Sequence, residues 1–296
     1  MTPPNAPTDG LVVVDKEPGW TSHDVVAKCR TVFGQRRVGH AGTLDPDATG
    51  VLLVGLGRVT RLLRFLTALP KTYAAEVVLG VATSTLDASG EVTGEWDMTQ
   101  VSIEEVREAA RRLVGPIMQV PPMVSALKVG GRRLYELARA GTEVEREARP
   151  VVVHRFDVEP AGEPNVVHIE VACSSGTYVR SLAADLGVAL GGGAHLRGLR
   201  RTAVGSFGVA DARPVAALDG GAVLSPAEAM RDYAAVSVTA DVAAEVAHGK
   251  VLGGDRLGVA GEGPWPLLDA EGRLLAVYQR HGHARAKPAV VLASAT

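Results

Sequence analysis

The order of hydrophobic and polar residues along the 296-residue chain predicts a mixture of strands and helices. Short apolar runs, or alternation of apolar and polar residues, predict strands at residues 11–14, 51–56, 73–80, 166–173 and 204–209. Helical spacing behind a capping residue, or before a glycine, predicts helices that start near residues 22, 103, 134, 177, 226 and 239. In the first of these helices, Thr21 and Asp24 form a capping-box pattern and Gly34 ends the apolar spacing. Ser102 and Glu105 form the same capping pattern at the start of the second.

The character of the chain changes after Tyr233, where apolar runs become short and are separated by glycine and proline. A small β-barrel is predicted by runs at residues 257–260, 266–269, 274–278 and 289–292. We therefore expect three parts: a disordered N-terminus at residues 1–10, a large domain at residues 11–232 and a small C-terminal domain at residues 233–296.

Hydrophobic residues make up 46% of the chain and charged residues 22%, which is typical of a globular protein with a substantial core. The two cysteines, Cys29 and Cys173, lack CxxC spacing, so we expect no disulfide framework and no zinc site. We see neither a signal-peptide pattern nor an apolar run long enough for a membrane span, and expect a cytoplasmic protein. No P-loop or dinucleotide-binding glycine pattern occurs, so no nucleotide cofactor is expected.

The net charge of −2 conceals an uneven distribution along the chain. Between Asp15 and Lys71, nine lysines and arginines stand against five acids, and the chain is basic again from Arg280 to Lys287. Basic residues gathered on one side of the folded protein would attract phosphates. A scattered, solvated arrangement is the alternative.

Residues 39–50 form the most unusual segment, with three glycines, a proline, a histidine and two acids between a basic helix and an apolar strand. We expect a loop over residues 35–50. Glycine allows the backbone to approach a ligand closely, and Pro46 restricts Asp45 to an extended backbone. This arrangement is suited to hold the Asp45 carboxylate in a cleft, and a solvated loop in which Asp45 caps a turn is the alternative.

Two further segments combine residues that suit a functional site. Tyr178 and Arg180 stand at the start of a predicted helix, where the arginine is suited to pair with a carboxylate and keep it ionised. Arg197, Arg200 and Arg201 fall within five residues, which suits phosphate contacts. Taken singly, the two segments are explained equally by a half-buried tyrosine with a surface arginine and by a solvated basic face.

Together, in this order and spacing, these segments resemble the TruB family, the bacterial tRNA pseudouridine-55 synthases. The likeness covers about residues 11–207. The motifs that carry it lie at residues 11–16 (LVVVDK), 19–22 (GWTS), 38–50 (VGHAGTLDPDATG), 71–73 (KTY), 121–122 (PP), 125–128 (SALK), 131–135 (GRRLY), 176–182 (GTYVRSL), 193–196 (GAHL) and 199–201 (LRR). Two positions depart from the family pattern: Ser84 stands where an aspartate is common, and Val124 where a tyrosine is common.

The resemblance implies an α+β pseudouridine synthase fold, with a long mixed sheet, flanking helices and a small β-rich, PUA-like RNA-binding domain at the C-terminus. It implies isomerisation of a T-loop uridine of tRNA, at position 55, to pseudouridine after the base flips into a pocket. This chemistry changes no redox state and uses no phosphate energy, so neither a cofactor nor a metal is implied. The expected partner is tRNA, bound through its T-arm, and we expect a monomer that binds no membrane.

The same resemblance assigns three catalytic positions. Asp45 matches the catalytic aspartate, which either attacks the ribose or takes a proton from it. Arg180 matches the arginine that pairs with this aspartate. Tyr73 matches the ring that stacks on the target base and that can accept a proton late in the reaction.

Four further positions match substrate-binding residues of the family. His40 matches the residue that fills the gap left by the flipped base. Tyr178 and Leu199 match walls of the pocket, and Lys16 matches a contact to a phosphate or a loop.

Two other functions fit parts of the sequence. Residues 45–49 fit DxDxT, the signature of aspartyl-phosphate phosphotransferases, although residues 38–43 before it contain few strand-forming residues. A tRNA-binding or tRNA-folding module without catalysis would keep the cleft. Such a module has no use for the combination of Asp45, Tyr73 and Arg180.

Overall fold

The computed structural model describes residues 8–125, 128–129, 132–133 and 144–293. The chain divides into two compact units, and each unit combines segments that are far apart in the sequence. The first unit takes its residues from 1–44, 52–67 and 205–296, and the second from 45–51 and 68–204. The three-part domain division expected from the sequence stays a prediction.

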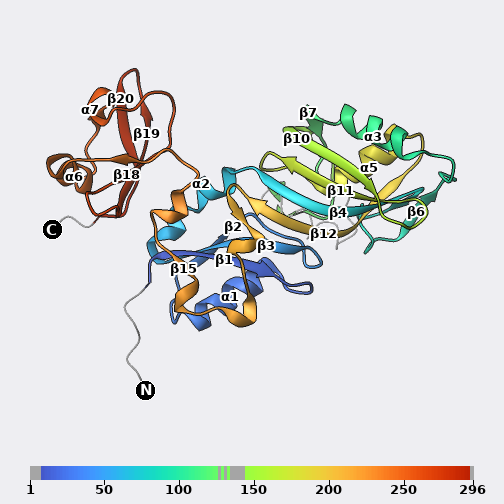
Figure 1. Cartoon of the computed structure of the whole chain (residues 1–296), viewed down its shortest axis with the longest axis horizontal. Coiled ribbons are helices and arrows are strands. Elements are labelled where there is room, and N and C mark those ends of the chain that lie inside the picture. Colours follow the sequence, from blue (N-terminus) through green and yellow to red (C-terminus); the bar gives the residue numbers. More distant parts are fainter. Residues whose placement is uncertain (1–7, 126–127, 130–131, 134–143, 294–296) are drawn as a thin grey trace. The chain divides into compact units, whose positions relative to one another are not determined.

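A mixed sheet forms the centre of the second unit (Figure 1). Its strand order is β3–β12–β4–β11–β10–β7, with β12 parallel to β3 and the other neighbours antiparallel. These strands are β3 (Thr49–Leu56, of which residues 49–51 belong to this unit), β4 (Lys71–Leu79), β7 (Gly115–Gln119), β10 (Arg149–Pro160), β11 (Val166–Cys173) and β12 (Ala194–Val204). Two short hairpins belong to the same unit: β5 (Val81–Thr83) with β6 (Val92–Glu95), and β8 (Lys128–Val129) with β9 (Arg132–Arg133).

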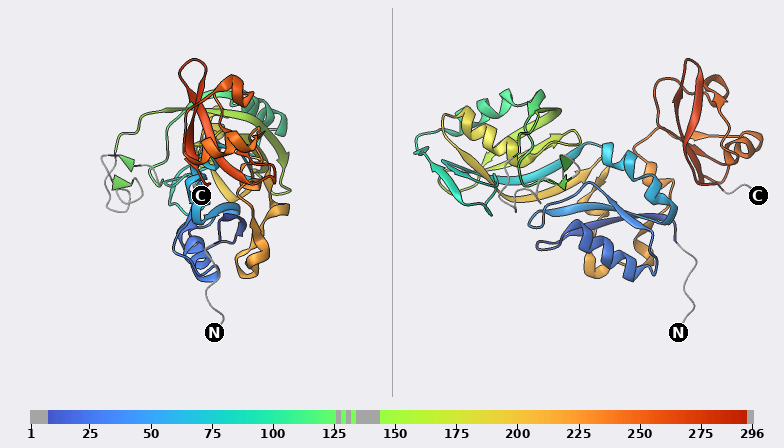
Figure 2. Two further views of the ribbon diagram at one scale, coloured as in Figure 1. Left: turned by 90° about the vertical axis from the view of Figure 1, so that its left-hand side faces the viewer. Right: turned by 180° about the vertical axis from the view of Figure 1, so that it is seen from behind.

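Two helices, α3 (Ile103–Arg112) and α5 (Val179–Ala189), pack against this sheet and against each other (Figures 1 and 2). Strand β11 shows the alternation predicted from its sequence, because the odd-numbered residues from 167 to 173 are buried while His168 and Glu170 are exposed. The mixed sheet and its flanking helices confirm the predicted α+β class.

Strand β1 (Gly10–Lys16) lies at the centre of the first unit, where it pairs with two short strands from later in the chain. These short strands are β14 (Arg213–Pro214) and β15 (Val223–Leu224), and β1 is also a neighbour of β3 in the sheet. Strand β2 (Val38–Ala41) pairs with the second part of β3. The helices of this part are α1 (Ser22–Val32) and α2 (Leu63–Ala68).

The C-terminal part of the chain forms a separate sheet with the order β16–β18–β19–β20–β17. Its elements are β16 (Val236–Ser237), α6 (Ala240–Ala247), β17 (Leu252–Gly253), α7 (Gly254–Leu257), β18 (Trp265–Leu268), β19 (Leu274–His281) and β20 (Arg285–Val291). Val246, Leu267 and Tyr278 are fully buried in the core of this sheet and its helices. The predicted β-rich C-terminal part is therefore confirmed.

Both predicted capping boxes are present at the starts of their helices. Thr21 accepts a hydrogen bond from the backbone N–H of Asp24, whose carboxylate accepts one from the backbone N–H of Thr21. Ser102 and Glu105 make the same reciprocal pair at the start of α3. These bonds satisfy backbone donors that a helix cannot satisfy internally, which is why the sequence located both helix starts.

The predicted loop over residues 35–50 is wrong in part, because β2 occupies residues 38–41 and Thr49 already belongs to β3. Strand β2 pairs with β3 in antiparallel register, from Val38 opposite Leu56 to Ala41 opposite Leu53. Glycine, histidine and alanine have weak strand propensity, and a buried neighbouring strand supplies what local propensity lacks.

Later in the chain, three predictions are wrong. The predicted strand at residues 204–209 is replaced by the end of β12 and a two-residue strand, β13 (Phe207–Gly208), because pairing of β12 with β4 runs from Ala194 to Val204. The helix expected after Ser225 is a single 3-10 turn at Glu228–Met230, and the strand expected at residues 257–260 is replaced by the last residue of α7, Leu257, and the turn after it. The helix predicted near residue 134 lies outside the described residues.

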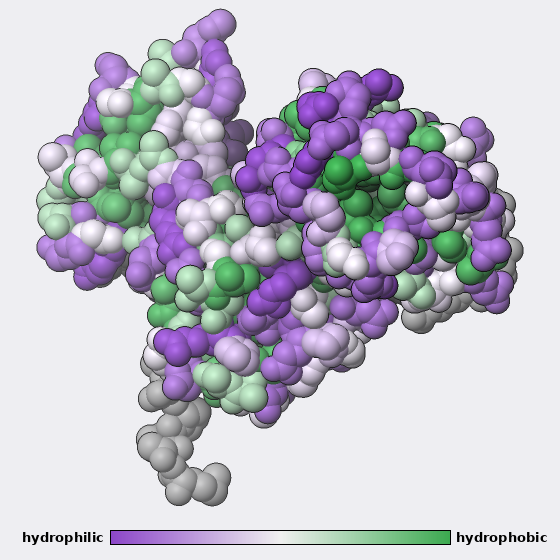
Figure 3. All heavy atoms as spheres, turned by 45° about the vertical axis from the view of Figure 1, so that its right-hand side comes forward, coloured by the Kyte–Doolittle hydropathy of each residue, from purple (hydrophilic) through white to green (hydrophobic). Residues whose placement is uncertain are grey.

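Within the described ranges, no helix combines the length and the apolar composition needed to cross a membrane. Across the same ranges, no group of three or more His, Cys, Asp or Glu side chains is arranged to hold a metal ion. In the view of Figure 3, polar residues cover most of the surface, and apolar residues form smaller areas between them.

The hydroxyl of Ser22 generates a prediction about stability. This side chain is 1% exposed, accepts a hydrogen bond from the backbone N–H of Leu44 at 2.9 Å and donates one to the carbonyl of Leu44 at 3.2 Å. Ser22→Ala leaves both buried backbone groups without this partner, and we expect the free energy of unfolding to fall by about 1–3 kcal/mol. Urea denaturation of the two proteins measures the difference.

Thr31→Ala is the matched control, because the Thr31 hydroxyl donates to the carbonyl of Ala27 on the exposed side of the same helix. Its effect should stay within about 0.5 kcal/mol. If Ser22→Ala changes stability no more than Thr31→Ala does, the hydroxyl does not hold Leu44 as described.

Candidate active site

Asp45 and Arg180, two of the residues that the sequence marked as candidates, form an ion pair. The Nη2 atom of Arg180 lies 2.8 Å from Oδ2 of Asp45. The arginine side chain is only 5% exposed, whereas the aspartate side chain is 45% exposed. A buried cation thus holds a carboxylate that remains open to solvent on its other side, and an adjacent opposite charge favours the ionised form of the acid.

Three further acceptors surround the Arg180 guanidinium. Its Nη1 donates to the carbonyl of Thr85 at 3.1 Å, and its Nη2 donates to the carbonyl of Val124 at 2.7 Å. The carboxylate of Asp87 lies 3.5 Å from Nη1. A buried guanidinium needs such acceptors, and their positions fix the direction in which it meets Asp45.

The backbone around both partners is also held in place. The carbonyl of Asp45 accepts a hydrogen bond from the N–H of Ala48 at 3.1 Å, so its backbone forms a turn while its carboxylate points to Arg180. Arg180 is the second residue of α5, whose N-cap residue Tyr178 makes no side-chain cap. The buried Gln119 of β7 supplies the bonds instead: its amide oxygen accepts from the N–H of Tyr178 at 2.7 Å and its amide nitrogen donates to the carbonyl of Tyr178 at 3.1 Å.

Tyr73 belongs to the same site through its electrostatics. It lies on β4, is 9% exposed, and its hydroxyl is hydrogen-bonded to Arg201. Burial raises the pKa of the Tyr73 phenol, Arg201 opposes this rise, and the negative charge of Asp45 adds to it. The phenol is therefore neutral at neutral pH.

Sequence reasoning missed two residues that organise this site, Asp87 and Gln119, and it assigned a third, Arg201, to phosphate contacts instead. Asp87 stands two residues after the Thr-Ser-Thr triplet, which was the only local signal for it. Gln119 and Arg201 acquire their roles through contacts between strands and a helix, and no local pattern marks them.

The three arginines that were candidates for phosphate contacts differ in burial and in ion pairing. Arg201 is 1% exposed, and such a side chain is not available to a phosphate at the surface. Arg197 pairs with Glu76 at 2.6 Å and with Glu163 at 3.1 Å. Of the three, the half-buried Arg200 fits the predicted role best.

Lys16 and His40 belong to the first unit, and their position relative to Asp45 stays a prediction. Lys16 is fully buried, and its ammonium donates to the carbonyls of Trp20 at 2.7 Å and Glu17 at 3.1 Å. Its role in substrate binding stays a prediction. The half-buried His40 on β2 packs edge-to-face on His23, with ring centroids 5.5 Å apart.

The predicted pocket walls lie in the second unit. Tyr178 is half-buried beside Arg180, and Leu199 is half-buried on β12. The pairing of β12 with β4 shifts register between Arg197 and Arg200, so Leu199 lies within a bulge. Bulges next to sites commonly redirect a side chain, which suits the expected role of Leu199.

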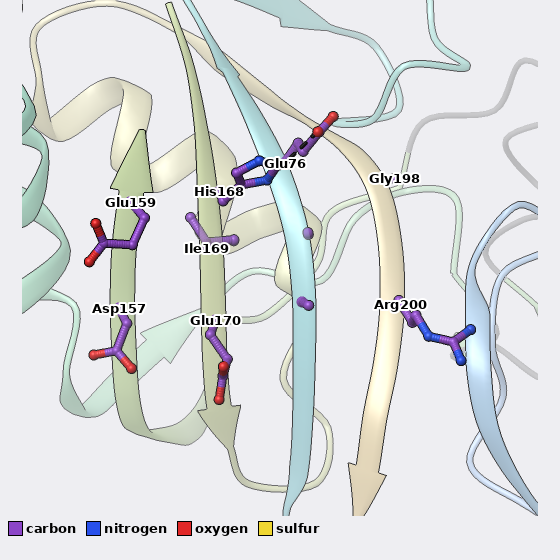
Figure 4. Close-up of a pocket in the computed structure, with 10 residues that line it drawn as sticks. Glu76, Asp157, Glu159, His168, Ile169, Glu170, Gly198 and Arg200 are labelled. Atoms are coloured by element: carbon purple, nitrogen blue, oxygen red, sulfur yellow. Dashed lines mark ion pairs between the residues drawn. The ribbon is translucent and has the colours of Figure 1, made fainter. Parts of the chain in front are cut away.

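A pocket of about 610 Å³ lies elsewhere on the sheet of the second unit (Figure 4). Its lining on β4 includes Ala74 and Glu76, which alternate with Tyr73 and thus face away from it. The acids that line it form ion pairs with nearby arginines: Glu76 with Arg197, Glu159 with Arg107, and Asp157 and Glu170 with Arg155. Neither Asp45 nor Arg180 is among the residues that line this pocket.

Two family models match consecutive parts of the chain. Residues 30–179 match the family described as TruB family pseudouridylate synthase (N terminal domain). Residues 180–228 match the tRNA pseudouridylate synthase B C-terminal domain.

Relatives named tRNA pseudouridine synthase B are similar over most of the chain. The protein from Mycobacterium bovis is 46% identical over 293 residues, which cover 97% of each chain. The protein from Corynebacterium aurimucosum is 49% identical over 279 residues, 92% of this chain and 93% of the relative. The protein from Symbiobacterium thermophilum is 50% identical over 246 residues, 81% and 82% of the two chains.

Among solved structures, a chain in the "Crystal Structure of a Cbf5-Nop10-Gar1 Complex" is similar with a TM-score of 0.76 and 25% identity. The match covers 97% of this chain and 85% of the other. Matches of this extent, in sequence and in fold, show that the chain belongs to the TruB family of pseudouridylate synthases.

Proposed function

We propose that the protein isomerises the T-loop uridine at position 55 of tRNA to pseudouridine, with Asp45 as the catalytic carboxylate. One observation carries the proposal: the half-exposed Asp45 carboxylate, held at 2.8 Å by the buried Arg180. The names of the relatives, tRNA pseudouridine synthase B, support tRNA as the substrate.

The reaction breaks the bond between uracil N1 and the ribose, turns the base, and joins C5 to the same ribose carbon. N1 gains a proton and C5 loses one, so the product is an isomer of the substrate. Attack on the ribose and removal of a ribose proton both require an ionised carboxylate beside the sugar. The Asp45–Arg180 pair supports this requirement, because the arginine favours the charged form of the acid.

The target base must leave the stacked T-loop before it reaches Asp45. We assign Tyr73 to stacking on the flipped base, with Tyr178 and Leu199 as further walls of the pocket and His40 as the residue that fills the gap in the RNA. The raised pKa of Tyr73 favours a neutral, hydrogen-bonding phenol over a free base in the substrate-bound state.

Partners and location follow from the same proposal. Asp45, Tyr73 and Arg180 come together within one chain, so the site needs no residue of a second copy. We propose that the protein acts as a monomer on the T-arm of tRNA in the cytoplasm. We assign residues 233–296 to RNA binding, because the β19–β20 hairpin exposes a group of basic side chains: His281, His283, Arg285 and Lys287.

The two alternative functions now stand differently. Membership of the TruB family removes the aspartyl-phosphate phosphotransferase suggested by residues 45–49. A tRNA-binding or tRNA-folding module without catalysis remains the competing proposal, and the first experiment below separates it from the enzyme.

Asp45→Asn should abolish formation of pseudouridine while tRNA binding stays within about threefold of the wild type, because the change removes a charge needed for chemistry and no predicted RNA contact. An unmodified tRNA transcript is incubated with each protein, and pseudouridine is mapped by position. Filter binding measures the affinity in parallel.

Asp47→Asn is the matched control, since Asp47 is an exposed acid in the same loop, and it should keep wild-type activity. Wild-type protein that binds tRNA but forms no pseudouridine would establish the binding module instead. Residual activity of Asp45→Asn above about one percent would exclude Asp45 as the essential carboxylate.

Arg180→Met should move the acid limb of the pH–rate profile to higher pH by about one to three units. The guanidinium favours the ionised carboxylate, so its loss makes protonation of Asp45 easier and the active form appears only at higher pH. Part of the lost rate should therefore return at high pH. Single-turnover rates measured across the pH range test this.

Arg180→Lys keeps a positive charge beside Asp45 and should retain an acid limb closer to that of the wild type. If Arg180→Met lowers the rate equally at every pH, the ion pair does not control the ionisation of Asp45. A loss of tRNA affinity in place of rate would assign Arg180 to RNA binding.

A further inference from the structure

Arg201 is among the largest fully buried side chains among the described residues, at 1% exposure. It lies on β12, where its backbone pairs with Tyr73 of β4 on one side and with Gly50 of β3 on the other. A buried guanidinium is costly unless its donors are satisfied, so its position between these two strands needs an explanation.

The side chain of Arg201 forms hydrogen bonds with Val51, which follows the loop that carries Asp45, and with Tyr73. Its Nε donates to the carbonyl of Val51 at 2.7 Å, and its guanidinium is hydrogen-bonded to the Tyr73 hydroxyl. Val51 follows Asp45 by six residues, at the point where the loop enters β3. One buried residue thus connects the end of the loop that carries Asp45 to the ring assigned to the substrate base.

The backbone around Arg201 is shaped for this contact. The pairing of β12 with β4 shifts register between Arg197 and Arg200, and again between Arg201 and Ala203. Opposite Arg201, Gly50 has φ +99°, and a Cβ there would lie 2.2 Å from the carbonyl oxygen of Arg201. The two register shifts of β12 and its close approach to Gly50, which only glycine permits, favour the direction in which the Arg201 side chain points.

The hydrogen bond to Tyr73 has a fixed direction. A guanidinium carries donors and no acceptor, so the phenol oxygen must accept from Arg201. The hydroxyl hydrogen of Tyr73 is then directed to a group other than Arg201. In the proposed reaction, the acceptor is an oxygen of the substrate nucleotide that lies near the plane of the ring.

We propose that Arg201 is a positioning residue for the isomerisation: it joins Tyr73 to the end of the Asp45 loop and orients the phenol to donate a hydrogen bond to the substrate. This proposal rests on the proposed function. It gives Arg201 no contact with RNA, in contrast to the phosphate role that its sequence suggested.

The charges that act on Tyr73 come from three residues: Arg201, Asp45 and Cys173. Arg201 stabilises its ionised form, while Asp45 and Cys173 destabilise it. Lys71 lies two residues earlier on β4, and burial together with the charge of Arg201 lowers the pKa of its ammonium to about 8. Since Arg201 is the cation that opposes the rise in the pKa of Tyr73, its removal should raise that pKa further.

Arg201→Met, Arg201→Lys and the control Arg107→Met test the proposal. Arg107 also donates to a strand carbonyl, that of Val158 at 3.0 Å, but lies outside the site. For each protein, single-turnover rates at saturating unmodified tRNA, tRNA affinity and melting temperature are measured. The ionisation of Tyr73 is followed by NMR of protein labelled with ¹³C at tyrosine Cζ, with the resonance assigned by Tyr73→Phe.

We expect Arg201→Met to lower the rate about 100-fold, because misplacement of reacting groups by about 1 Å has an effect of this size. The affinity for tRNA should stay within about threefold of the wild type. Arg201→Lys should recover part of the rate, since it restores a cationic donor. The pKa of Tyr73 should be higher in Arg201→Met than in the wild type. Arg107→Met should change neither the rate nor the pKa of Tyr73.

If Arg201→Met does not fold, Arg201→Lys decides: it should fold, and its rate should fall because one ammonium cannot replace both bonds of the guanidinium. Wild-type rates in the folded Arg201 variants would overturn the proposal. So would a rate loss in which lysine is no better than methionine and Tyr73 titrates unchanged, because that result describes a purely structural arginine. Absence of turnover in both the wild type and Arg107→Met would instead refute the proposed function, while the titration of Tyr73 still tests the contact with Arg201.

Discussion

The contact between the buried guanidinium of Arg180 and the half-exposed carboxylate of Asp45 is the interaction on which the site depends. Burying an arginine is unfavourable unless acceptors surround it, and here the carbonyls of Thr85 and Val124 and the carboxylate of Asp87 supply them. Because these acceptors come from separate segments of the second unit, the ion pair can form only when that unit is folded. The fold therefore determines the direction of the Asp45 carboxylate.

The loop that carries Asp45 is anchored on both sides. Before it, the hydroxyl of Ser22 binds both backbone groups of Leu44. After it, Arg201 binds the carbonyl of Val51. The proposed catalytic role of Asp45 requires a carboxylate held by residues that are themselves fixed, and these buried contacts fix the backbone at Leu44 and at Val51.

Local patterns in the sequence were sufficient wherever a residue acts on its near neighbours. Thr21 and Ser102 marked helix starts because their hydrogen bonds close within three residues, and the alternation along β11 marked its buried face. The motif around Asp45 and Arg180 indicated an ion pair, which the structure contains. Local patterns failed for β2, whose glycine-containing strand forms only because β3 lies beside it.

The sequence also did not show which charged and polar side chains are buried. Lys16 and Arg201 have the composition of phosphate-binding residues, yet both are buried and bind backbone carbonyls. Gln119 caps a helix that follows it by about sixty residues, and only the tertiary fold shows this contact. A charged or polar side chain has the same letter in the sequence whether it meets solvent, RNA or another strand.

The central claim, that Arg180 keeps Asp45 ionised and directed at the substrate, can be tested without RNA. Protein labelled with ¹³C at aspartate Cγ is titrated and followed by NMR, with the Asp45 resonance assigned by its absence in Asp45→Asn. The account predicts that Asp45 takes up its proton at a pH about one to three units higher in Arg180→Met than in the wild type. Identical titration midpoints in the two proteins, both folded, would contradict it.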